Sequence, residues 1–151
     1  MIFIAAFPLD DGESCTQAAT EASAAAGIDW EGGPNLGDGF LIAADGSVTL
    51  DPVVAARCLY NDCDDATVKW ALDRLGPHPF GNLNQAPLTF AWKSTSSTYV
   101  VCADDLGVHP DLQRILANRC SSVVEWPTGH SPFLSDPQRV VGLIAEAARH
   151  A

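Results

Sequence analysis

Basic residues are scarce in this sequence. Its 151 residues include 8 Lys and Arg against 19 Asp and Glu, which gives a formal net charge of −11. Nucleic acids and anionic membrane surfaces are bound through clustered Lys and Arg. We therefore expect neither a nucleic acid nor a membrane as partner, and favour small neutral molecules or other proteins.

Long apolar runs are also missing. No segment approaches the roughly 20 residues that a membrane-spanning helix needs. The apolar opening, residues 1–7, is too short for a signal-peptide core, has no basic flank and ends at Pro8. A hydrophobic content of 47% with 18% charged residues nevertheless argues against disorder. The sequence predicts a folded chain of one domain's size, without a membrane span or export signal.

Paired cysteines are absent as well. The cysteines are odd in number and scattered, at Cys15, Cys58, Cys63, Cys102 and Cys120. They form no CxxC pair and no Cys/His spacing typical of zinc sites. We expect reduced thiols, no disulfide and no metal, in a reducing cytoplasm.

The first 92 residues predict short elements. The unbroken apolar run of residues 2–7 is typical of a parallel strand covered on both faces. Capping and turn signals then predict three helices and one hairpin. These are a helix between Ser14 and Gly27, a hairpin around Asp45-Gly46, and helices over residues 52–59 and 64–75. Residues 78–88, rich in Pro, Asn and Gly, predict a loop.

The last part of the chain is more regular. Residues 98–103 predict a second buried strand and residues 122–126 a third strand, and helices are expected over residues 110–118 and from Asp136 onward. Residues 127–135 are expected to form a loop. Strand, helix, strand and helix at this spacing form a βαβα unit, which implies a parallel sheet and an α/β fold.

Two polar groups follow the predicted strands at the point where each strand ends. Asp105, or its neighbour Asp104, follows residues 98–103, and His130 follows the strand that ends near Trp126. Functional groups of parallel sheets gather at these carboxyl ends. A carboxylate on one imidazole nitrogen would leave the other nitrogen free as a base. The alternative is a solvated turn pair that caps the next helix, beside an ordinary loop histidine.

The same segments resemble a known family. Residues 99–105 (Tyr-Val-Val-Cys-Ala-Asp-Asp), 111–114 (Asp-Leu-Gln-Arg) and 129–134 (Gly-His-Ser-Pro-Phe-Leu) look like the C-terminal part of an α/β-hydrolase. The opening Phe-Ile-Ala-Ala-Phe-Pro resembles the strand before that family's lid. The branch is the one that includes plant methyl esterases and hydroxynitrile lyases.

The resemblance implies the C-terminal portion of an α/β-hydrolase fold, in which parallel strands with flanking helices carry an inserted helical cap with a small hairpin. Residues 1–7 would be a core strand, 8–92 the cap, and 93–151 the C-terminal part of the core. Asp105, preferred to Asp104 as the second residue of the dipeptide, would be the triad acid and His130 the base. The resemblance further implies a small apolar ester substrate and no cofactor.

The family's nucleophile motif, G-x-S-x-G, does not occur in this sequence. Residues 129–133 match its first three positions, but Pro132 follows Ser131 directly and Phe133 replaces the last glycine. Cys15 and Cys102 are no better nucleophiles, since one heads a helix and the other lies in a buried strand. We therefore expect negligible hydrolysis by this chain alone.

Two alternatives remain open. Beside the leading interpretation, a serine-type hydrolase of small carboxylic esters, the chain could be an inactive truncated remnant. Such a remnant would pair with the missing half or form a homodimer through the exposed edge of its opening strand. The second alternative is a module that binds a small ligand. A hydroxynitrile lyase activity is less favoured, because Ser131 stands where the lyases have a lysine.

Overall fold

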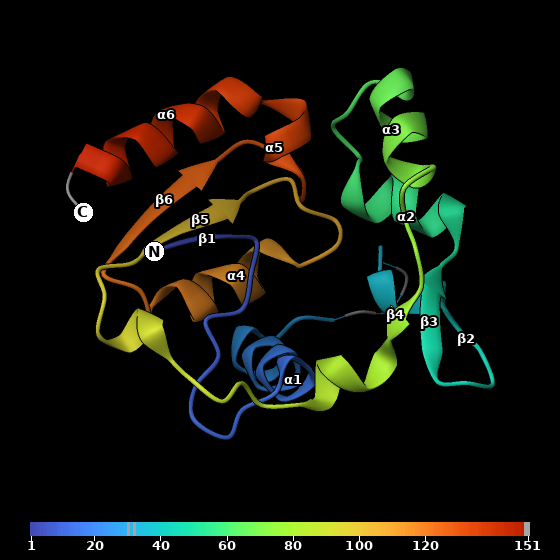
Figure 1. Cartoon of the computed structure of the whole chain (residues 1–151), viewed down its shortest axis with the longest axis horizontal. Helices are drawn as coiled ribbons and strands as arrows, with labels where there is room; N and C mark the ends of the chain where they lie inside the picture. Colours follow the sequence, from blue (N-terminus) through green and yellow to red (C-terminus); the bar gives the residue numbers. More distant parts are fainter. Residues whose placement is uncertain (30, 32, 150–151) are drawn as a thin grey trace.

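The computed structural model describes residues 1–29, 31 and 33–149. Figure 1 shows a parallel sheet with helices on both faces, beside a second group of helices and short strands. No helix in these described ranges has the length and apolar composition needed to cross a bilayer.

The main sheet has three parallel strands in the order β1 (Ile2–Ile4), β5 (Thr98–Cys102) and β6 (Ser122–Trp126). The central strand β5 is buried, and Tyr99 through Cys102 are fully shielded from solvent. This arrangement confirms the predicted α/β class.

The opening strand is shorter than predicted. It ends at Ile4 and its residues are only half-buried, so the expectation of a strand over residues 2–7 covered on both faces is wrong. Ala5 ends it with a φ of 45°, a left-handed conformation that costs an alanine about 1–2 kcal/mol. Within the described residues β1 pairs only with β5. A homodimer through its other edge stays a prediction.

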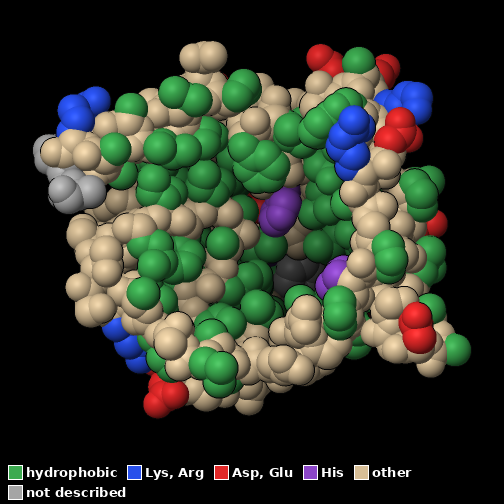
Figure 2. Space-filling model, viewed as in Figure 1, with side chains coloured by type: hydrophobic (Ala, Val, Ile, Leu, Met, Phe, Trp, Pro, Cys, Tyr) green, Lys and Arg blue, Asp and Glu red, His purple; other side chains and the backbone are tan. Residues whose placement is uncertain are grey.

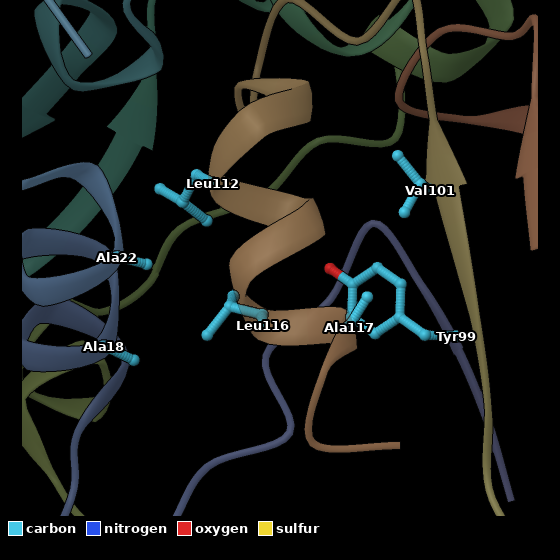
Figure 3. Close-up of a cluster of buried hydrophobic side chains, with 7 residues drawn as sticks. All are labelled: Ala18, Ala22, Tyr99, Val101, Leu112, Leu116 and Ala117. Carbon is cyan, nitrogen blue, oxygen red and sulfur yellow. The ribbon is translucent and has the colours of Figure 1, made fainter. Parts of the chain in front are cut away.

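Helices α1 (Cys15–Ala26) and α4 (Pro110–Ala117) pack on one face of this sheet. The predicted capping box starts α1, because Ser14 Oγ accepts the N–H of Gln17 while Gln17 Oε1 accepts the N–H of Ser14. Gly27, with a φ of 65°, ends the helix. Figure 3 shows the small side chains of α1 facing α4, and α4 facing β5. This buried cluster holds Ala18, Ala22, Tyr99, Val101, Leu112, Leu116 and Ala117.

Helix α6 (Pro137–Arg149) covers the opposite face. Its Val140 packs with Val100, Cys102 and Trp126. The segment before it, predicted as a loop over residues 127–135, contains one more short helix, α5 (Pro132–Ser135). Pro132 at the first helical position favours this extra turn.

The second group of elements contains the predicted hairpin, β2 (Phe40–Ile42) and β3 (Ser47–Leu50), followed by α2 (Pro52–Leu59) and α3 (Asp65–Leu72). Residues 78–88 are not simply a loop. Within them, β4 (His78–Pro79) pairs antiparallel with β3 through Val48, and a 3-10 helix, η2 (Phe80–Asn84), follows.

Two further 3-10 turns, η1 (Leu36–Gly39) and η3 (Ala91–Lys93), complete the elements of the described residues. The division into a core strand, a cap over residues 8–92 and a C-terminal core stays a prediction.

Candidate active site

The structure brings Asp105 and His130 together. Asp105 follows β5 and His130 follows β6, and His130 Nδ1 lies 2.9 Å from Asp105 Oδ2. The Asp105 side chain is buried, whereas that of His130 is 23% exposed. The pair thus lies at the carboxyl ends of neighbouring parallel strands, where the sequence placed both residues. Their catalytic role remains a prediction.

The carboxylate of Asp105 is surrounded by donors. Its Oδ1 accepts the backbone N–H groups of Gly107 at 2.7 Å and Val108 at 2.9 Å, and its Oδ2 accepts the Gln113 Nε2 amide at 2.8 Å. Such donors stabilise the ionised acid. An ionised carboxylate only accepts hydrogen bonds, so the proton between the pair belongs to His130 Nδ1. In the neutral imidazole with its proton on Nδ1, Nε2 carries the lone pair that a general base needs.

Asp104 has a different environment. Its side chain is exposed, and its backbone N–H donates to the carbonyl oxygen of Thr128 at 3.0 Å. Its own carbonyl oxygen accepts the Asn61 side-chain amide. Of the two adjacent acids, the structure places only Asp105 on the imidazole.

Sequence reasoning missed Gln113. This fully buried glutamine lies on α4, accepts the N–H of Cys102 through Oε1, and donates through Nε2 to Asp105 and to the carbonyl oxygen of Val108. A signal existed in the sequence. Gln113 occupies the same helix face as the core residues Leu112 and Leu116, and a polar group there must find partners.

Ser131, Cys15 and Cys102, the residues considered as nucleophiles, make no side-chain hydrogen bond to the imidazole of His130 among the described residues. Ser131 is buried at the start of α5, and burial raises the pKa of the Cys102 thiol to about 11. In the parts of the chain that the structure describes, no hydroxyl or thiol hydrogen-bonds to Nε2 of His130.

The surface around this region is concave. Figure 2 shows a hollow between the parallel sheet and the second group of elements, lined largely by hydrophobic side chains, with histidine side chains at it. Among residues 1–29, 31 and 33–149, no group of three or more His, Cys, Asp or Glu is arranged to hold a metal ion.

Comparison with known proteins shows the family. The model of the "Alpha/beta hydrolase family" matches residues 2–143. The chain belongs to the α/β-hydrolase family. It is 35% identical over 111 residues to the "Alpha/beta hydrolase nvfD" of Aspergillus novofumigatus, a match that covers 71% of this chain and 44% of that protein.

Solved structures of the family share its fold. The crystal structure of polyneuridine aldehyde esterase matches with a TM-score of 0.73 at 17% identity, over 97% of this chain and 61% of that chain. The methylesterase MES16 from Arabidopsis matches with a TM-score of 0.65 at 17% identity, over 99% of this chain and 58% of that chain. The chain therefore spans less than two thirds of the length of these relatives.

Proposed function

We propose that Asp105 and His130 are the acid and base of a Ser-His-Asp triad that hydrolyses small carboxylic esters, with the serine supplied from outside the 151 residues. The proposal rests on the 2.9 Å contact between His130 Nδ1 and the buried carboxylate of Asp105, which also accepts hydrogen bonds from Gly107, Val108 and Gln113. The fold shared with an esterase and a methylesterase supports esters as the substrate class.

The proposed reaction follows from the free lone pair on Nε2. The serine hydroxyl attacks the ester carbonyl carbon while Nε2 of His130 takes its proton, and Asp105 stabilises the resulting imidazolium. When the tetrahedral intermediate collapses, the alcohol leaves with that proton. Water then attacks the acyl-serine with Nε2 again as base, which releases the carboxylic acid and restores the serine.

The chain alone should be nearly inactive, because losing the nucleophile removes most of a triad's rate advantage. Ser131 does not replace it, since Pro132 follows directly and Ser131 is buried. A serine in place of the lyases' lysine also favours ester hydrolysis over hydroxynitrile cleavage.

The test starts by sequencing about a hundred codons upstream of Met1, which is roughly the length of the part of the fold that carries the nucleophile in this family. An in-frame G-x-S-x-G motif is expected there, and the longer product should hydrolyse p-nitrophenyl acetate. His130→Ala and Asp105→Asn should each lower kcat/KM by about a hundredfold or more, while the matched neighbour Asp104→Asn should leave it within about threefold. A long product that is equally active with His130→Ala would refute the proposal.

A second candidate function for the isolated chain is the binding of a small apolar ligand without turnover. It is favoured by an open surface pocket of about 430 Å³ between α3 and α5, whose lining includes Trp70, Phe133 and Leu134. A ligand at 100 times its Kd would stabilise the chain by about 2.7 kcal/mol. A rise in Tm with small esters or their acids, without hydrolysis, would support binding; an unchanged Tm at saturating concentrations would refute it.

The compartment belongs to the same proposal. All five cysteines are free thiols in the structure. We propose a reducing compartment such as the cytoplasm.

A further inference from the structure

The turn between α2 and α3 reaches across to both loops that carry the acid and the base. Asp62 Oδ2 accepts the backbone N–H of Gly129 at 2.6 Å and the Ser135 hydroxyl at 2.8 Å. The adjacent Asn61 donates its side-chain amide to the carbonyl oxygen of Asp104 at 2.9 Å. These bonds join positions at least 43 residues apart in the sequence.

Gly129 is shaped for this contact. A Cβ at residue 129 would lie 2.4 Å from Asn61 Oδ1 and 2.6 Å from Asp62 Oδ1, distances that real Cβ atoms do not show. Only a residue without a side chain lets the carboxylate come this close to the backbone. Gly129 directly precedes His130, so the bond holds the peptide from which the base projects.

The contact from Gly129 to Asp62 is partly buried and charge-assisted. Hydrogen bonds from an N–H to an ionised carboxylate contribute about twice as much as neutral ones. Asp62 itself remains exposed, so removing its carboxylate empties no part of the core. Its contribution falls on the loop before His130 rather than on the packing of the sheet.

We propose that Asp62 is a positioning residue that fixes the peptide of Gly129 and thereby orients the imidazole of His130 toward Asp105. This inference rests on the proposed function for its catalytic meaning. With the hydrogen bond between Asp62 and Gly129 in place, His130 Nδ1 stays within hydrogen-bond distance of Asp105. When this bond is lost, the loop that carries His130 becomes more mobile.

The test uses the full 151-residue chain and reads the histidine directly. In protein labelled with ¹⁵N-histidine, NMR measures the solvent exchange of the His130 Nδ1 proton that is bonded to Asp105. Asp62→Ala should accelerate this exchange by about tenfold, the effect of one lost hydrogen bond to a charged group. Asp62→Asn keeps an acceptor oxygen for Gly129 and should stay within about threefold of the unmodified chain.

Asp65→Ala is the matched control, because Asp65 is an exposed acid three residues away in the first turn of α3. It should leave the exchange unchanged. An Asp62→Ala protein with unaltered exchange, or an Asp65→Ala protein accelerated as much as Asp62→Ala, would overturn the proposal. If Asp62→Ala does not fold, the backbone N–H of Gly129 in the unmodified chain decides: protection from exchange supports the bond, and exchange at the rate of an open loop refutes it.

These results separate the inference from the function on which it rests. If the longer product hydrolyses esters but Asp62→Ala leaves the exchange of the His130 Nδ1 proton unchanged, the proposed function stands and the positioning role of Asp62 is refuted. Conversely, an Asp62-dependent exchange in a longer product without esterase activity would keep the geometry and refute the reaction.

Discussion

Replacing Gln113 by leucine tests whether the buried amide holds the carboxylate of Asp105 in place. In the structure Gln113 makes three short hydrogen bonds, to the Cys102 N–H at 2.9 Å, to Asp105 Oδ2 at 2.8 Å and to the Val108 carbonyl oxygen at 2.7 Å. Leucine is similar in size, so Gln113→Leu removes the polar atoms and leaves little cavity.

The expected loss of stability in Gln113→Leu follows from the backbone groups that lose their hydrogen-bond partner. The buried N–H of Cys102 and the partly buried carbonyl of Val108 lose this partner, and each such unsatisfied group costs about 1–3 kcal/mol. Asp105 keeps its two backbone donors and His130. Burial of a more apolar side chain returns about 1 kcal/mol. We expect the free energy of unfolding to fall by about 3 kcal/mol, which most folded domains survive.

A second variant separates shape from charge. Gln113→Glu keeps the shape but places a second carboxyl group beside the Asp105 carboxylate. When protonated, that group can donate to Asp105 Oδ2 as the amide does; when ionised, it repels it. Its pKa in the folded state is therefore raised above the value of about 4.3 in the unfolded chain. Stability is retained below that value and falls by about 1.4 kcal/mol per pH unit as the pH rises toward the folded-state pKa.

The assay is urea unfolding followed by tryptophan fluorescence at pH 5 and pH 7. Gln17→Glu is the matched control, because Gln17 is an exposed glutamine whose capping role a glutamate can also perform. It should show no comparable loss between the two pH values. The reasoning would be refuted by a Gln113→Leu protein within about 0.5 kcal/mol of the unmodified chain, or by a Gln113→Glu penalty that is the same at both pH values.

Two further predictions concern groups away from the base. The Arg119 guanidinium, 2.9 Å from the largely buried carboxylate of Glu13, holds the pKa of Glu13 below its ordinary value. Glu13→Gln should therefore lower the free energy of unfolding by about 2 kcal/mol at pH 7, and by less as the pH falls through the folded-state pKa. An equal loss at pH 3 and pH 7 in urea unfolding would contradict this. Burial raises the pKa of Cys102 to about 11. Iodoacetamide at pH 8 should therefore label Cys102 at least about tenfold more slowly than the partly exposed Cys63. Equal labelling rates of the two thiols, measured by peptide mass spectrometry, would disprove the buried placement of Cys102.

The elements that the sequence predicted well depend on neighbours in the chain. The capping box of Ser14 and Gln17, the turn at Asp45-Gly46 and the helix start at Asp51 are set by residues within four positions. Elements that depend on distant partners were missed or misjudged. Strand β4 is visible only through its pairing with Val48, thirty residues away, because His78 and Pro79 carry no strand signal of their own.

The site divides in the same way. Asp105 and His130 were expected near one another because both follow strands at the same edge of the sheet, and the family resemblance favoured Asp105 over Asp104. Gln113 carried only the general signal of a polar residue among the core-facing positions of a helix, and Asp62 carried none, because an acid in a turn has many ordinary uses. Their roles appear only when burial gives Gln113 three partners and folding brings Asp62 to Gly129.

Asp105 and His130 are therefore held mainly by different parts of the molecule. Asp105 takes two donors from its own turn and one from α4, all within eight residues, so the hydrogen bonds to its carboxylate are local in the chain. His130 meets Asp105, but the peptide before it is bonded to Asp62, 67 residues away in the turn between α2 and α3. Loss of the Asp62 bond should therefore loosen the peptide before His130, while Asp105 keeps its donors.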